Sequence, residues 1–228
     1  MKKTNSQKNG LTSQKALAFW IPNNKEEIAI NRRSHLEKIT QVDEIWERLK
    51  VKLGDVLAVD SPHTFHPESF TYEELAENIS KAADSFSQMG AGSDDVVALF
   101  AENSPRWLIA DQGLMRIGAS DAVRGATAPA TELRYILEDS NAVGLIVQNS
   151  EVLERLSLDA RKINSLKFVI QLEGKACDGV FDWESFLKQG LNKSNVSHQE
   201  NVIDIKQSKI ATILYTSGTT GRPKGVPL

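Results

Sequence analysis

The residues best suited to chemistry lie together in the segment YTSGTTGRPKG at 215–225. Three glycines, Gly218, Gly221 and Gly225, let the backbone approach a ligand closely and turn its amide groups inward, which forms a nest for anions. The segment also carries hydroxyl side chains and cations, at Thr216, Ser217, Thr219, Thr220, Arg222 and Lys224. No carboxylate in the segment balances these cations. Binding of a polyphosphate requires such a combination, so we expect a phosphate-binding loop.

Two familiar phosphate loops do not fit this segment. A Walker A loop needs Gly-Lys-Ser/Thr at its end, whereas here Pro223 precedes Lys224 and Gly225 follows it. The glycine-rich pattern of protein kinases, G-x-G-x-x-G, is also absent from the segment. An ordinary turn of small residues is the remaining alternative. The ordered string Ser-Gly-Thr-Thr-Gly-x-Pro-Lys-Gly, with one free place in nine, favours the phosphate loop.

The elements around this loop alternate between strand and helix. An apolar strand at 210–215 runs directly into the loop, and another is expected at 95–100. Further strands are expected near residues 119, 143 and 166, and the weakest of them is 119–123, because Asp121 interrupts it. Helices are expected from Ser104-Pro105 to about Gly118, and after Thr131 and Ser150. This order predicts an α/β fold with a mostly parallel sheet and crossover helices.

The rest of the chain gives clear local signals at a few places. Thr71 and Glu74 form a capping box that starts a helix, and Gly90 ends it. We also expect a short amphipathic helix at 42–50, a strand at 56–59, a loop at 61–69, and a helix from Asp182 to Gly190. Residues 191–207 are polar and read as a surface connection. Residues 1–40 lack periodicity and read as an irregular lead-in.

Composition excludes several classes of function. The net charge of −3 over 228 residues gives no basic field, so nucleic acid is not an expected partner. The single cysteine and four histidines form no zinc-ligand pattern, and we expect no metal ligands. No apolar run reaches the length of a membrane span. The start of the chain is acid-poor but lacks arginine, which favours a polar N-terminus over a transit peptide. We therefore expect a cytoplasmic protein, with the plastid stroma or a peripheral membrane contact as alternatives.

The string YTSGTTGRPKGV at 215–226 resembles the signature loop of the acyl-adenylate-forming, or AMP-binding, superfamily. This superfamily includes acyl-CoA synthetases, peptide-synthetase adenylation domains and firefly luciferase. The stretch VALFAENSPRWLIADQGLMRIGASDAVRG at 97–125, with ELRYILEDSNAVGLIV at 132–147, resembles long-chain acyl-CoA and acyl-acyl carrier protein synthetases of cyanobacteria and plastids. The resemblance covers residues 42–228.

The resemblance implies a two-step ligase. A fatty acid carboxylate attacks the α-phosphate of ATP, and the thiol of CoA or of acyl carrier protein then displaces AMP. It implies ATP and Mg²⁺ as cofactors, and phosphate contacts from Thr216, Ser217, Gly218, Thr219, Thr220, Gly221, Lys224 and Gly225. Arg222 stands at the variable place of the motif, and its role stays open. Residues 41–228 would be the N-terminal, incomplete portion of the large adenylation domain.

Some expected parts are missing. The magnesium-binding glutamate motif, the ribose-binding aspartate and the C-terminal catalytic lysine of the family have no match in the sequence. We therefore assign no catalytic residue and expect a truncated, inactive fragment in which Pro227 prevents the second strand of the loop from forming. The alternative is a non-catalytic module that binds a nucleotide or a partner. Of the residues in the second stretch, we place Trp107, Leu108 and Ile109 in the core, and Asp111 and Gln112 in solvated or capping positions.

Overall fold

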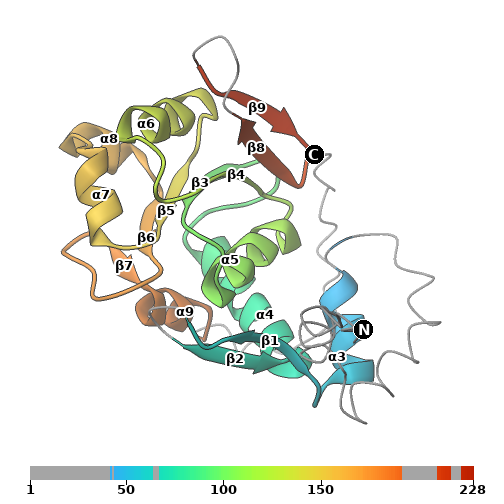
Figure 1. Ribbon diagram of the computed structural model, residues 1–228. Coiled ribbons are helices and arrows are strands. Elements are labelled where there is room, and N and C mark those ends of the chain that lie inside the picture. The colour runs from blue at the N-terminus through green and yellow to red at the C-terminus, as the bar shows by residue number, and fades with distance from the viewer. Residues whose placement is uncertain (1–41, 43, 64–66, 192–209, 217–221) are drawn as a thin grey trace, which may run out of the picture. The chain divides into compact units, whose positions relative to one another are not determined.

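A seven-stranded sheet with the order β7-β6-β5-β3-β4-β8-β9 carries the fold (Figure 1). The computed structural model describes residues 42, 44–63, 67–191, 210–216 and 222–228. Neighbouring strands are parallel except β8 and β9, which form an antiparallel hairpin. The strands of this sheet are β3 (Val96–Phe100), β4 (Ser120–Arg124), β5 (Gly144–Val147), β6 (Phe168–Gln171), β7 (Phe181–Asp182), β8 (Thr212–Thr216) and β9 (Lys224–Pro227).

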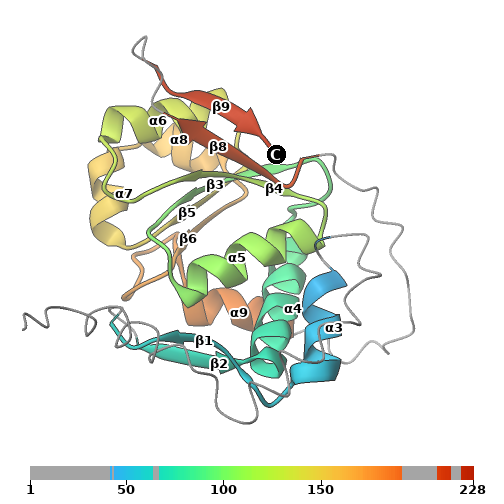
Figure 2. The same ribbon diagram turned by 45° about the vertical axis from the view of Figure 1, so that its right-hand side comes forward.

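Helices cover both faces of the sheet. The described helices are α3 (Glu44–Leu53), α4 (Tyr72–Gln88), α5 (Pro105–Arg116), α6 (Ala130–Asp139), α7 (Ser150–Leu156), α8 (Ala160–Ser165) and α9 (Trp183–Leu191). Figures 1 and 2 show α4, α5 and α9 on one side of the sheet and α6, α7 and α8 on the other. A separate antiparallel hairpin, β1 (Leu57–Ser61) and β2 (Glu68–Thr71), lies beside α4. The predicted α/β class with a mostly parallel sheet is confirmed.

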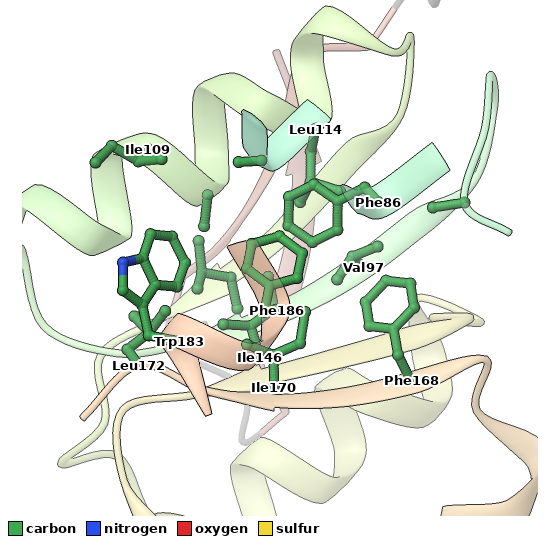
Figure 3. Packing of buried hydrophobic residues seen from close by; sticks show 14 of the residues in the cluster. Phe86, Val97, Ile109, Leu114, Ile146, Phe168, Ile170, Leu172, Trp183 and Phe186 are labelled. Carbon is green, nitrogen blue, oxygen red and sulfur yellow. The ribbon is translucent and has the colours of Figure 1, made fainter. Parts of the chain in front are cut away.

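Two hydrophobic clusters form the core, one on each face of the sheet. The pleat directs alternate residues of β3 to opposite faces, so Val97 and Leu99 join one cluster while Ala98 and Phe100 join the other. The first cluster contains an aromatic group in which the ring centroids of Phe86 and Phe186 are 4.7 Å apart (Figure 3). Both faces of the sheet are thus buried, as expected for parallel strands with crossover helices.

The strongest local predictions are confirmed. Thr71 accepts a hydrogen bond from the amide of Glu74 while the Glu74 carboxylate accepts from the amide of Thr71, and this capping box starts α4. Ser104 caps α5 in the same way by accepting from the amide of Trp107. Asp182 accepts from the amide of Ser185 and caps α9.

Other boundaries differ from the predictions. Helix α6 follows Pro129, without a side-chain cap, rather than Thr131, and Asn149 rather than Ser150 caps α7. Strand β4, the weakest prediction, is a central strand between β3 and β8 in spite of Asp121. Helix α8 was not predicted.

The prediction that Pro227 blocks the second strand of the loop is wrong. Strand β9 pairs with β8 from Lys224 to Pro227, and Ile213 is the register partner of Pro227. Proline is tolerated there because β9 is an edge strand, so its missing N–H interrupts no further ladder. The chain continues the pairing beyond it, where the amide of Leu228 donates to the carbonyl of Thr212 at 2.9 Å.

The solvated or capping positions predicted for Asp111 and Gln112 are also wrong. Both side chains are buried, on the face of α5 that meets the sheet and α3. The amide Nε2 of Gln112 donates to Asp111 Oδ2 at 2.6 Å, and the indole of Trp46 donates to Gln112 Oε1 at 2.6 Å. Ile109 is in the core as predicted, and Trp107 and Leu108 pack partly buried against it.

Candidate functional site

The predicted phosphate loop connects β8 to β9. Thr216 is the last residue of β8 and Lys224 the first of β9, and the two are register partners with exposed side chains. Gly225 pairs with Tyr215 one step further along the hairpin. The other predicted site residues, Ser217, Gly218, Thr219, Thr220 and Gly221, lie outside the described residues. The structure therefore places the two ends of the predicted site side by side.

Packing explains why position 225 is a glycine, and the sequence alone did not indicate this. A Cβ atom at this position would lie 2.9 Å from Cγ2 of Ile213 and 3.1 Å from Cζ of Tyr215. Those separations are shorter than side chains tolerate, so only glycine lets β9 approach the ring of Tyr215 this closely. The glycine predicted to contact phosphate thus also closes the hairpin beneath the loop.

Tyr215 fixes the end of β8 to α6. Its side chain is 5% exposed, and its hydroxyl donates to Asp139 Oδ2 at 2.8 Å. The other oxygen of that carboxylate, Oδ1, accepts from the hydroxyl of Tyr135 at 2.9 Å. Burial, and then the hydrogen bond to Asp139, raises the pKa of Tyr215. The hydrogen bond to Asp139 is the main cause that raises the pKa of Tyr135. Both phenols are therefore held as donors to one carboxylate.

Two arginines contact the neighbours of Asp139 on α6. Nε of Arg124, at the end of β4, forms an ion pair of 2.7 Å with Oε1 of Glu132 on α6. Its Nη1 donates to the carbonyl of Tyr215 at 3.4 Å. The guanidinium of Arg222 lies over the ring of Tyr135, with its Cζ 5.6 Å from the ring centroid, which is cation–π distance. The role of these α6 residues is not visible in the sequence, since Tyr215 and Arg222, which they contact, lie far away along the chain.

The opposite end of β8 is held by a buried polar group. The hydroxyl of Ser120 donates to the carbonyl of Ile210 at 2.5 Å, just before the strand begins. The next residue of β4, Asp121, is 1% exposed and is the register partner of Thr212. Burial is the largest cause that raises the pKa of Asp121 well above 3.8, and the neighbouring Asp111 carboxyl adds to it. Burial and the neighbouring carboxyl therefore both favour the neutral form of Asp121 at the junction of α5 and β4.

A polar cluster follows the strands at the same edge of the sheet as the loop. Glu102, after β3, accepts hydrogen bonds from the amide and hydroxyl of Thr127 at 3.3 Å. The amide of Glu102 donates to Gln148 Oε1, which follows β5. Ligands of open parallel sheets bind at the carboxyl ends of the strands, where the crossover loops meet. Because β8 runs parallel to β4, Thr216 at its end lies at that edge, directly before the predicted phosphate loop.

Within the described ranges, no group of three or more His, Cys, Asp and Glu side chains could hold a metal ion. Within the same ranges, no helix is long and apolar enough to cross a membrane.

Solved structures share the fold of this chain. The anthranilate CoA ligase AuaEII in complex with anthranoyl-AMP superposes with a TM-score of 0.68 at 22% identity, over 82% of this chain and 34% of that chain. The N-terminal domain of FACL13 from Mycobacterium tuberculosis superposes with a TM-score of 0.65 at 20% identity, over 83% of this chain and 44% of that one. At these identities the likeness shows the fold, which is that of the N-terminal domain of adenylate-forming enzymes.

Several curated proteins are similar to this chain in sequence. "Probable acyl-activating enzyme 16, chloroplastic" of Arabidopsis thaliana is 37% identical over 201 residues, which are 82% of this chain and 28% of the relative. The long-chain-fatty-acid–acyl-carrier-protein ligase AEE15, chloroplastic, of the same plant is 35% identical over the same shares of both chains. The long-chain-fatty-acid–CoA ligase ACSBG2 of Rattus norvegicus is 26% identical over 224 residues, which are 95% of this chain and 34% of the relative. The chain thus spans about a third or less of the length of these relatives. Residues 47–228 match the family described as AMP-binding enzyme, and the chain belongs to that family.

Proposed function

We propose that the loop between β8 and β9 binds the phosphates of ATP during the activation of a long-chain fatty acid. The carboxylate would attack the α-phosphate to give acyl-AMP and pyrophosphate, and the thiol of CoA or acyl carrier protein would then displace AMP. Family membership supports the nucleotide, and the names of the curated relatives support the fatty acid and both acceptors. The observation that carries the proposal is the pairing of Thr216 with Lys224 at the loop's base, at the carboxyl edge of the sheet.

The proposed reaction requires positioned positive charge and hydrogen-bond donors from the loop, and it requires no nucleophilic side chain. In-line displacement at phosphorus is accelerated mainly by donors and cations held around the phosphates. In this proposal Thr216, Lys224 and the five residues Ser217, Gly218, Thr219, Thr220 and Gly221 supply those donors. Gly225 acts differently, because its contact with Tyr215 sets the spacing of the two strands. Mg²⁺ would enter with ATP, and we derive no step from a metal held by the described residues.

The same proposal covers the organisation and location of the chain. Residues 41–228 would form part of an adenylation domain, with 1–40 as its lead-in. We place the protein in the cytoplasm, and the chloroplastic relatives make the plastid stroma the second choice. A contact with the membrane surface would suit an enzyme with a long-chain fatty acid as substrate.

Titration of ATP and of pyrophosphate into the purified chain, followed by calorimetry, tests the proposed site. Lys224→Ala should weaken binding roughly tenfold or more, because it removes a charged donor to phosphate. Lys175→Ala is the matched control, since Lys175 is an exposed lysine in the turn after β6. Equal affinity of wild type and Lys224→Ala would overturn the proposed site.

A second measurement separates the ligase from the non-catalytic module. Exchange of labelled pyrophosphate into ATP that depends on a long-chain fatty acid would support adenylation by this chain. ATP binding without such exchange, by a chain with a folded circular dichroism spectrum, would favour the binding module.

A further inference from the structure

Helix α6 presents one polar edge and one apolar edge. Glu132, Tyr135 and Asp139 are spaced three and four residues apart, which brings them to one side of the helix. Leu133, Ile136 and Leu137 are fully buried in the core cluster beneath. The apolar residues therefore fix the helix on the sheet, and the polar edge meets β4 and the β8–β9 hairpin.

This polar edge holds the chain directly before the phosphate loop at two points. Asp139 binds the side chain of Tyr215 through the hydroxyl. Glu132 binds Arg124, and Arg124 in turn donates to the backbone carbonyl of Tyr215. Tyr215, the last buried residue of β8, is thus held at its hydroxyl by Asp139 of α6 and at its backbone by Arg124 of β4, which pairs with Glu132 of α6.

The same edge contacts the chain directly after the loop. The guanidinium of Arg222 lies over the ring of Tyr135, and the hydroxyl of that ring donates to Asp139. A phenol that donates to a carboxylate has a more electron-rich ring, so it attracts a cation more strongly. Asp139 and Arg222 are exposed, so this part of the arrangement lies at the surface, whereas the ring of Tyr215 is buried.

We infer that α6 positions the phosphate loop by holding both of its ends, with Tyr135 as the positioning residue for Arg222. This inference rests on the proposed function, because it assumes that the loop binds phosphate. The inference assigns a role to Arg222, which occupies the one variable position of the loop motif. Arg222 anchors the loop to α6 instead of contacting phosphate, and Asp139 links that anchor to Tyr215.

Affinity for ATP, measured by calorimetry on the full chain, tests this role with three variants. Tyr135→Leu removes the ring, Arg222→Met removes the cation, and each should weaken ATP binding roughly two- to fivefold, the effect of an exposed cation–π contact. The double variant should be no weaker than either single variant, since both changes remove the same contact. Tyr135→Phe keeps the ring and should retain most of the affinity. Thermal unfolding of each variant checks that it is folded.

The outcomes separate this inference from the proposed function. A loss with Arg222→Met that Tyr135→Leu does not share would mean that Arg222 contacts phosphate directly, and would overturn the positioning role. The inference also fails if the losses add in the double variant, or if Glu138→Gln, an exposed change on the same helix, lowers affinity equally. If Lys224→Ala abolishes binding while Tyr135→Leu and Arg222→Met have no effect, the proposed function stands and the positioning role falls. If wild type binds neither ATP nor pyrophosphate, the proposed function falls and this inference falls with it.

Discussion

The ring of Tyr215 lies against Gly225, its register partner across the β8–β9 hairpin, with no room for a side chain between them. Because the hydroxyl of Tyr215 is bonded to Asp139, the ring is not free to move aside. Cγ2 of Ile213, the second neighbour, belongs to a stiff β-branched side chain. The last glycine of the loop motif is therefore fixed by packing as well as by any contact with a ligand.

Replacement of this glycine should destabilise the chain. We expect Gly225→Ala to lower the free energy of unfolding by about 1–3 kcal/mol, the usual cost of overpacking. Gly92→Ala is a suitable control, since nothing lies within 4 Å of a Cβ at Gly92. That control should change stability by less than about 0.5 kcal/mol, as surface changes do. Denaturant unfolding of both variants checks the prediction, and equal stabilities would contradict it.

The buried pair Asp111 and Asp121 should make stability depend on pH. Burial raises the pKa of both carboxyls above 3.8, so the folded pair keeps a proton that the unfolded chain releases. The bound proton makes its full contribution to the free energy of unfolding at pH values below the ordinary carboxyl pKa. That contribution is lost as the pH rises through the raised pKa of the folded protein.

Asp121→Asn removes this loss because the amide carries no charge. The variant should gain stability relative to wild type as the pH is raised above 3.8, and the gain should level off above the native pKa of the pair. Thermal unfolding at a series of pH values measures the difference. Parallel curves for variant and wild type would show that the pair is not the source of the dependence.

Ser85 of α4 makes two hydrogen bonds in the interior, one within its own helix and one to α9. Its hydroxyl donates to the carbonyl of Lys81 and accepts from the amide of Gly190, both at 2.9 Å. We expect Ser85→Ala to cost about 0.5–1.5 kcal/mol, since it removes the side-chain hydrogen bond to the buried amide of Gly190. Ser87→Ala, a half-exposed change in the same helix, should be close to neutral. Hydrogen exchange at the Gly190 amide would show the local effect, and an unchanged rate in Ser85→Ala would refute it.

Arg106 connects three separate elements at the start of α5. Its guanidinium pairs with Glu68 of β2 at 2.8 Å and with Glu184 of α9 at 3.2 Å, and donates to the carbonyl of Leu172 at 2.6 Å. Arg106→Met should lower stability by about 1–3 kcal/mol, because the carbonyl of Leu172 and the largely buried carboxylate of Glu68 lose their donor. Arg106→Lys should fall between methionine and wild type, since an ammonium cannot reproduce the planar fork. Chemical denaturation ranks the three proteins, and a lysine variant as stable as wild type would argue against a need for the fork.

Local signals predicted the elements well where their cause is local. The capping box at Thr71 and Glu74 and the Ser104 cap each involve atoms within one helical turn, so the sequence contains the whole interaction. The positions of the parallel strands followed from apolar runs for the same reason. The order of the strands did not, because register and neighbours depend on contacts between distant segments.

Predictions failed where a distant partner changes the environment of a residue. Asp111 and Asp121 look solvent-exposed or disruptive in sequence. The raised pKa of Asp121, which favours its neutral form, and the hydrogen bond from Gln112 to Asp111 are consistent with the burial of both. Pro227 looks like a strand breaker, but its place on an edge strand makes the missing donor harmless.

The sequence by itself determined the family of this protein and predicted a phosphate-binding motif, because the order of glycines, hydroxyls and cations at 215–225 is a local chemical pattern. Only the tertiary structure decided how that motif is held. Tyr135 and Asp139 lie 80 and 76 residues before Tyr215, and they reach the loop only because α6 packs on the sheet beside β8. Because α6 and the β8–β9 hairpin are distant in sequence, the contacts between them can be identified only once the order of the strands is known.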